Sequence, residues 1–173
     1  SMGSVAASGG YWVAARSDRI FARPETITGS IGVFAMIPNL KDLGNRFGLT
    51  WDTVKTAPHA DVFSIVRPRT DKEMDGIQAY VDDVYDRFLN HVSAGRDLNR
   101  TAVEGIAEGR VWSGRVAREV GLVDEFGGLE DAIRYAVELA EMPKDFQVIE
   151  HPRVETPFEL LSEILEEPVV RKT

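Results

Sequence analysis

A serine followed by two glycines near the N-terminus is the feature of this sequence best suited to covalent chemistry. Ser8 lies in the run Ala6–Gly10, directly before Gly9 and Gly10. Glycine within a helix costs about 1 kcal/mol relative to alanine, so two in succession need a reason. One reason is the close approach of a substrate, with the bare N–H of Gly9 holding an oxyanion beside a serine nucleophile. The alternative is a small-residue helix packed against a neighbouring element.

Composition limits the other kinds of site. The chain has 173 residues and a net charge of −8, which disfavours a nucleic-acid partner because phosphates are neutralised by clustered Lys and Arg. Without cysteine there are no disulfides or thiolate sites, and the three histidines have no metal-binding spacing. We therefore expect no metal and no cofactor. No apolar run reaches the roughly 20 residues that span a bilayer.

The elements that position Ser8 follow from hydrophobic patterning. We expect a buried helix over residues 4–16, strands over residues 19–22, 33–36 and 49–55, and a glycine turn over residues 28–32. Strands alternating with helices predict an α/β domain. A helix over residues 39–47 ends at Gly48, and residues 56–70 form a loop. The longest helix, residues 71–94, should bury one stripe, made of Met74, Ile77, Val81, Val84, Phe88 and Val92.

The second half is predicted to be mainly helical. We expect a short helix over residues 101–108 and another that Ser113 caps and that ends at Gly121. A third helix follows Gly127 and Gly128 and runs to about residue 141. A strand over residues 146–150 and an amphipathic helix over residues 157–166 follow. The acidic pair at residues 82–83 is interpreted as charge on a helix face, residues 124 and 125 as local support, and residues 11 and 12 as core.

Separate segments, in the same order, resemble the signal peptide peptidase A family, also called protease IV: Ser1–Trp12, Pro24–Phe34, Gly109–Gly114 and Gly121–Gly128. The resemblance implies a Clp protease/crotonase-like fold of repeated strand–strand–helix units, here lacking its first strands. It makes residues 1–145 an N-terminally incomplete C-terminal peptidase domain of a long two-domain form. Residues 146–173 are then a C-terminal extension with a short strand and an amphipathic helix.

The same resemblance assigns roles to three residues. Ser8 is the nucleophile of a serine–lysine dyad, Gly9 supplies an oxyanion N–H, and Ser30 orients the lysine base. A serine hydroxyl is a poor nucleophile until a neighbouring group takes its proton. In short family members the lysine lies in the loop that matches residues 56–61, and the matching position here is Ala60.

Four explanations for the missing base stay open. In the first, which we favour, the lysine comes from an N-terminal domain outside this chain. In the second and third, a residue of this chain is the base: either Lys55, or His59 with or without Asp61. In the fourth, the module has no catalytic activity. On the first explanation this chain alone is inactive or nearly so.

The resemblance also implies the partners. They are cleaved signal peptides and similar apolar peptides, the missing N-terminal domain and further copies of the chain in a ring or dome. A membrane contact would come only through an anchor outside these residues, at the periplasmic face of a bacterial inner membrane. The competing functions are a non-catalytic assembly module of the same fold and a crotonase-like acyl-CoA enzyme.

Overall fold

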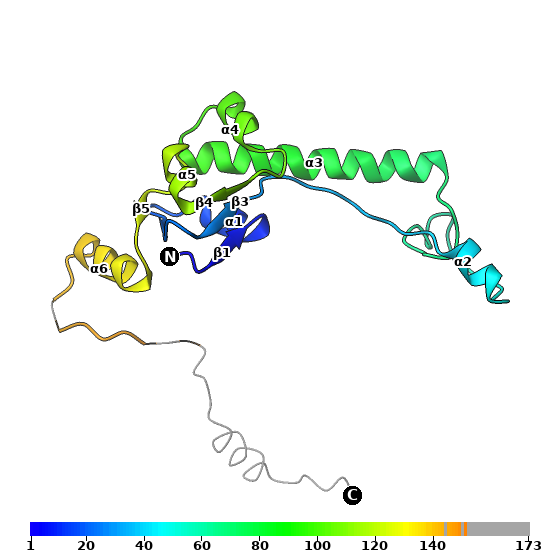
Figure 1. Ribbon diagram of the computed structural model, residues 1–173, viewed down its shortest axis with the longest axis horizontal. Coiled ribbons are helices and arrows are strands. Elements are labelled where there is room, and N and C mark those ends of the chain that lie inside the picture. Colours follow the sequence, from blue (N-terminus) through cyan, green and yellow to red (C-terminus); the bar gives the residue numbers. More distant parts are fainter. Residues whose placement is uncertain (144, 150, 152–173) are drawn as a thin grey trace, which may run out of the picture. The chain divides into compact units, whose positions relative to one another are not determined.

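Short strands and helices alternate along the N-terminal part of the chain, as the sequence predicts for a mixed α/β domain (Figure 1). The computed structural model describes residues 1–143, 145–149 and 151. The chain divides into two units, Ser1–Ala136 and Val137–Thr173. The elements are β1 (Val5–Ala7), α1 (Gly9–Ala14), β2 (Phe21–Ala22), β3 (Ile27–Gly29), α2 (Lys41–Arg46), α3 (Asp71–Arg96), α4 (Arg100–Ile106), β4 (Val111–Ser113), α5 (Gly114–Glu119), β5 (Glu125–Phe126) and α6 (Leu129–Leu139).

Two small sheets join segments that are distant in the sequence. The first sheet has the strand order β1-β3-β4, in which β1 is parallel to β3 and β4 is antiparallel to β3. The second sheet is the parallel pair of β2 and β5. The helix expected over residues 4–16 is therefore wrong in its first half, where β1 lies. The alanine-rich segment has helical propensity, but pairing with β3 satisfies its backbone and overrides that weak preference. The strand expected over residues 19–22 is confirmed as β2.

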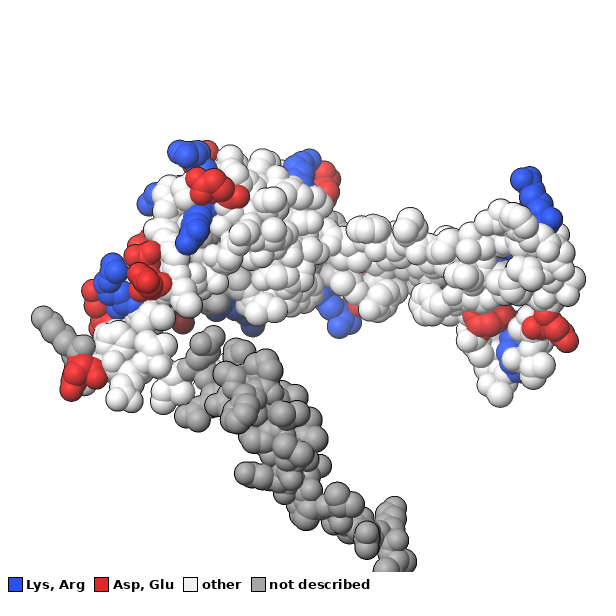
Figure 2. All heavy atoms as spheres, turned by 60° about the horizontal axis from the view of Figure 1, so that its bottom comes forward, with Lys and Arg blue, Asp and Glu red and all other residues white. Residues whose placement is uncertain are grey.

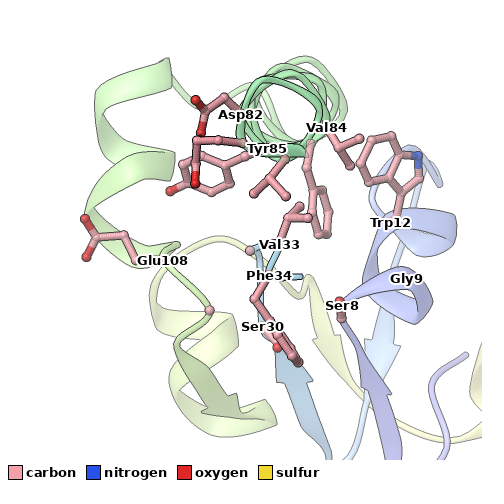
Figure 3. A pocket seen from close by; sticks show the side chains of 15 residues that line it. Ser8, Gly9, Trp12, Ser30, Val33, Phe34, Asp82, Val84, Tyr85 and Glu108 are labelled. Carbon is pink, nitrogen blue, oxygen red and sulfur yellow. The ribbon is translucent and has the colours of Figure 1, made fainter. Parts of the chain in front are cut away.

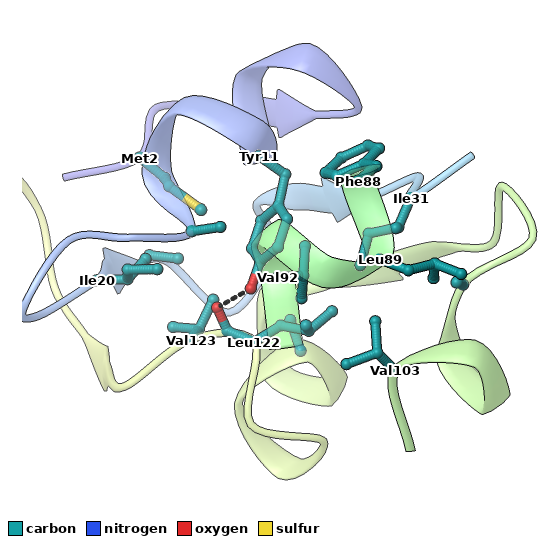
Figure 4. Close-up of a cluster of buried hydrophobic side chains, with 14 residues drawn as sticks. Met2, Tyr11, Ile20, Ile31, Phe88, Leu89, Val92, Val103, Leu122 and Val123 are labelled. Carbon is teal, nitrogen blue, oxygen red and sulfur yellow. Dashed lines mark hydrogen bonds between the residues drawn. The ribbon is translucent and has the colours of Figure 1, made fainter. Parts of the chain in front are cut away.

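The hydrophobic core of the first unit lies between α1 and the C-terminal half of α3 (Figure 4). Tyr11 is fully buried, as predicted, and its hydroxyl donates to the carbonyl of Leu122 over 2.9 Å. Burial raises the pKa of this phenol. Other buried members come from several elements: Met2, Ala15, Ile20, Ala22, Ile31, Phe88, Leu89, Val92, Val103, Ala107, Ala117 and Val123.

The long helix is confirmed, but its predicted stripe is only partly buried. Of the six apolar residues expected to face the core, Phe88 and Val92 are buried, whereas Met74 is 48% exposed. The helix begins at a capping box, in which the Thr70 hydroxyl accepts from the Glu73 N–H and the Glu73 carboxylate accepts from the Thr70 N–H.

The segment between β3 and α3 contains one short helix and long irregular stretches. The helix predicted over residues 39–47 is confirmed as α2, followed by Gly48 at φ 75°. The strands expected over residues 33–36 and 49–55 are wrong. A strand needs a neighbour for its backbone N–H and C=O groups, and neither segment pairs with any described residue. The predicted loop over residues 56–70 is confirmed.

An ionic cluster fastens this loop to the start of α3. The guanidinium of Arg67 bonds to both carboxylate oxygens of Asp61, at 2.6 and 2.8 Å, and to both of Glu73, at 2.9 and 2.7 Å. These bonds hold the pKa of each carboxyl well below its usual range.

The remaining predictions concern the second half. Ser113 caps α5 as expected, its hydroxyl accepting from the Val116 N–H. Asp124 has a structural role, but its contacts are with distant segments: it accepts from the Ile20 N–H over 2.7 Å and from the Arg96 guanidinium. Residues 146–149 form no strand, and residue 150 and the helix predicted over residues 157–166 lie outside the described residues. Within the described part of the chain, no helix combines the length and apolar character needed to cross a membrane.

Charges of both signs are interspersed on the surface. Figure 2 shows small groups of Lys and Arg side chains beside Asp and Glu side chains on a face that is otherwise mostly uncharged. Several form pairs, such as Arg100 with Asp86 at 2.6 Å. That face carries no extended basic patch of the kind that binds nucleic acid.

Candidate active site

Ser8 occupies a sharp turn between a strand and a helix. It directly follows β1 and precedes α1, with φ 51° and ψ −118°. A residue with a side chain reaches this region only at a cost of about 1–3 kcal/mol, and such strain clusters at functional sites. A strained serine on a strand-to-helix turn also exposes the nucleophile of many hydrolases. The Ser8 side chain makes no capping bond to α1, so helix capping does not explain its position.

Ser30 lies beside Ser8 because their strands are parallel neighbours. In the register of β1 with β3, Ala7 pairs with Gly29, so each serine is the next residue after its strand. The carboxyl ends of parallel strands meet at one edge of a sheet, which is where ligands bind in open α/β folds. The Ser8 N–H donates to the Gly29 carbonyl over 2.8 Å, and the Ser30 N–H donates to the Arg110 carbonyl over 2.8 Å.

A third segment reaches the same edge just before β4. The Gly109 N–H donates to the Ile31 carbonyl over 2.9 Å, and a Cβ on Gly32 would lie 2.6 Å from the Gly109 nitrogen. Only glycine permits this approach at position 32. Among the described residues, five non-glycine residues have positive φ, and three of them gather here: Ser8, Ser30 and Glu108, at 51°, 50° and 56°.

These segments surround a cavity of about 730 Å³ (Figure 3). Its apolar lining comes from Trp12, Val33, Phe34, Val81, Val84 and Phe88, and its polar side chains are Ser8, Ser30, Gln78, Asp82, Tyr85 and Glu108. The α3 side chains lie across the cavity from the two serines in this view. The site thus combines a strained hydroxyl with an apolar wall large enough for peptide side chains.

Gly9 leaves the first turn of α1 open towards the cavity. The first N–H groups of a helix have no acceptor within the helix, and Gly9 is the first helical residue. A Cβ added at Gly9 or at Gly10 would meet nothing within 4 Å. Neither glycine is therefore required by packing in the described structure, and Gly9 lines the cavity.

The bases considered within this chain lie elsewhere. The Lys55 ammonium donates to the Pro58 carbonyl over 3.1 Å and to Asp61 over 3.2 Å, and His59 Nδ1 lies 3.2 Å from a Glu73 oxygen. Neither Lys55 nor His59 lines the cavity beside Ser8, but Gln78 does, and it is five residues from Glu73 on α3, or about 8 Å at 1.5 Å per residue. His59 lines a second cavity of about 450 Å³, which shares Val33, Phe34 and Val81 with the first. The cavity lining contains no lysine, arginine or histidine from the described residues.

Several lining residues were not singled out by their sequence pattern. Trp12 was expected in the core; it packs on Phe88 with ring centroids 4.6 Å apart and also lines the cavity. Asp82 was interpreted as helix-face charge, yet it too lines the cavity. The positive φ of Glu108, in the turn before Gly109, has no sequence signal. Within the described ranges, no three acidic or histidine side chains are grouped as a metal site would need.

Comparisons with known proteins identify the family of the chain. The model of the family described as "Peptidase family S49" matches residues 1–143. The chain is 41% identical over 148 residues to "Protease 4" of Haemophilus influenzae, covering 86% of this chain and 24% of that protein. It is 43% identical over 130 residues to "Putative signal peptide peptidase SppA" of Enterococcus faecium, covering 75% of this chain and 38% of that protein. The chain therefore spans well under half of the length of these two relatives, and it belongs to peptidase family S49.

Proposed function

We propose that this chain carries the nucleophile of a serine endopeptidase of the Ser/Lys dyad type. The observation that carries the proposal is the strained Ser8, held on a strand–helix turn inside a cavity that Gly9 and Ser30 also line. Membership of family S49 and the protease names of its relatives support hydrolysis of peptides.

In the proposed reaction, Ser8 Oγ attacks the scissile carbonyl as a neutral lysine amine takes its proton. The Gly9 N–H stabilises the oxyanion of the tetrahedral intermediate. On collapse, the C–N bond breaks and the lysine ammonium protonates the departing amine. Water then hydrolyses the acyl-enzyme by the same steps, with the lysine again acting as base. Ser30 accepts a hydrogen bond from the lysine and keeps its amine directed at Ser8.

The lysine is proposed to come from an N-terminal domain that is not among these residues. Two observations support this: position 60 is alanine, and neither Lys55, which bonds to Asp61, nor His59, which bonds to Glu73, lines the cavity. A lysine acts as base only where burial lowers its pKa towards neutrality. The apolar wall of the cavity offers such surroundings. We expect the chain alone to hydrolyse peptides very slowly or not at all.

The wider setting is proposed from the family resemblance. The fold would be Clp protease/crotonase-like, with residues 1–145 as peptidase domain and residues 146–173 as an extension. Substrates would be cleaved signal peptides and other apolar peptides. Copies of the chain would assemble around the sites, and an anchor elsewhere would hold the protein at the periplasmic face of a bacterial inner membrane.

Labelling with a fluorophosphonate tests the proposal. The full-length protein should be modified at Ser8, and Ser8→Ala should abolish both labelling and peptide cleavage. Replacing Ser4, which is exposed and outside the cavity, with alanine is the matched control and should preserve both. A non-catalytic module or an acyl-CoA enzyme would not be labelled at Ser8, and that result would refute the peptidase proposal. Hydrolysis by this chain alone would instead refute the absent-lysine proposal.

A further inference from the structure

The inference concerns the substrate preference of the same cavity and so rests on the proposed function. Helix α3 presents two kinds of side chain there. Val81, Val84 and Phe88 contribute to the apolar lining, and Gln78, Asp82 and Tyr85 contribute polar groups. Within each set the spacing is three or four residues, which places its members on one face of a helix. A peptide bound beside Ser8 therefore meets an apolar strip and a polar strip along one helix.

Asp82 is the carboxylate on this polar strip. Its Oδ1 accepts from the Gln78 side-chain amide over 2.7 Å, which fixes its direction without neutralising it. None of the described residues that line the cavity is a lysine, arginine or histidine, and no described cation forms an ion pair with Asp82.

The neighbouring acids differ in this respect. Asp83, one residue along α3, lies outside the cavity lining and bonds to Arg87 over 2.9 Å. Glu108 lines the cavity, but its carboxylate bonds to Arg110 over 2.7 Å. Asp82 is thus the cavity carboxylate whose charge the described chain leaves without a cationic partner.

We propose that Asp82 is a specificity-determining residue that selects peptides carrying a lysine or arginine next to their apolar residues. The apolar side chains of the peptide fill the strip beside Trp12 and Phe88, and its cationic side chain reaches Asp82. Signal peptides have this composition, because a basic segment precedes their apolar segment. Fragments that retain the junction of the two segments would be preferred over wholly apolar ones.

The size of the preference follows from the exposure of Asp82. Its side chain is exposed, so an ion pair with substrate resembles other solvent-accessible pairs, which contribute up to about fivefold in an equilibrium or rate ratio. Added salt should reduce this preference, because exposed charges are screened.

The test compares peptides that share one apolar sequence and differ by lysine or glutamine at a single position, scanned along the peptide. Both termini are blocked, so that the side chain is the added cation. We expect the full-length protein to cleave one lysine peptide with a kcat/KM about fivefold above its glutamine partner. Asp82→Asn should bring this ratio to about one, and Asp82→Lys should favour a glutamate peptide instead.

Asp83→Asn is the matched control, because it removes the same charge one residue away and should retain the ratio. An unchanged ratio in Asp82→Asn overturns the inference while leaving the proposed function intact. An equal fall in Asp83→Asn also overturns it, since the preference would then come from the general field of the helix. Undiminished cleavage by Ser8→Ala, or cleavage of neither peptide by the unaltered protein, refutes the proposed function and the inference with it. A folded state is checked for each variant by its thermal unfolding.

Discussion

Replacing Ser8 by glycine should make the protein more stable than replacing it by alanine. Alanine keeps the strain of φ 51° and ψ −118°, about 1–3 kcal/mol, whereas glycine relieves most of it. Glycine loses more chain entropy on folding, at a cost of about 0.5–1 kcal/mol. The difference leaves Ser8→Gly more stable than Ser8→Ala by about 1 kcal/mol, or roughly 2–4 °C in Tm.

The assay is thermal or denaturant unfolding of the two variants, with Ala7→Gly as control. Ala7 is the preceding residue, within β1, where glycine relieves no strain and should cost about 0.5–1 kcal/mol. Both Ser8 variants lose the nucleophile, so chemistry cannot explain a difference between them. Without strain at Ser8, glycine would cost the same at both positions. Ser8→Gly would then be less stable than Ser8→Ala by the amount that Ala7→Gly is less stable than the unaltered protein, and this result would refute the reasoning.

Three further changes test other parts of the structure. Gly32→Ala should destabilise the protein by about 1–3 kcal/mol through its clash with the Gly109 backbone, which an unfolding experiment measures. The displaced cavity edge should also lower kcat/KM for peptide cleavage by about tenfold or more. Tyr11→Phe leaves a buried carbonyl without its donor and should lower the free energy of unfolding by about 1–3 kcal/mol, measured in denaturant. The bonds of Arg67 depress the pKa of Glu73, so their stabilisation is complete above the unfolded pKa of about 4.3 and is lost as pH falls below it. The protection factors for hydrogen exchange in residues 56–70, which are corrected for the intrinsic pH dependence of exchange, should fall on acidification below about pH 4 and stay constant between pH 6 and 8.

The sequence predicts the long helix well because its signals are local. Thr70 and Glu73 stand at the spacing of a capping box, and the apolar period extends to Phe88 and beyond. Local signals do not predict a segment whose structure depends on pairing with a distant strand. Residues 5–7 are rich in small helix formers, yet they pair with β3, whereas residues 49–55 have strand-forming residues and no partner in the described structure.

The sequence predicts the serine side of the candidate site better than the side formed by Trp12 and α3. Ser8, Gly9 and Ser30 belong to motifs that family resemblance identifies, and the structure brings all three to one cavity. Asp82 and Trp12 line the same cavity but follow ordinary helical patterns. Which face of a helix meets a cavity depends on tertiary packing, and the amphipathic period alone does not distinguish a core from a cavity wall.

The position of Ser8 beside Ser30 depends on the register of β1 with β3. Two buried threonines, Thr26 and Thr28, stabilise this register. The Thr26 and Thr28 hydroxyls donate to the carbonyls of residues 3 and 6, at 2.9 and 2.7 Å, across the β1–β3 pairing. A slip of one residue would turn every side chain of a strand to its opposite face and leave both hydroxyls without these acceptors. Burial makes such a loss costly, since an unsatisfied polar group has no water to replace its partner. The geometry of Ser8 beside Ser30 is therefore specified by hydrogen bonds two or more residues away from any proposed chemistry.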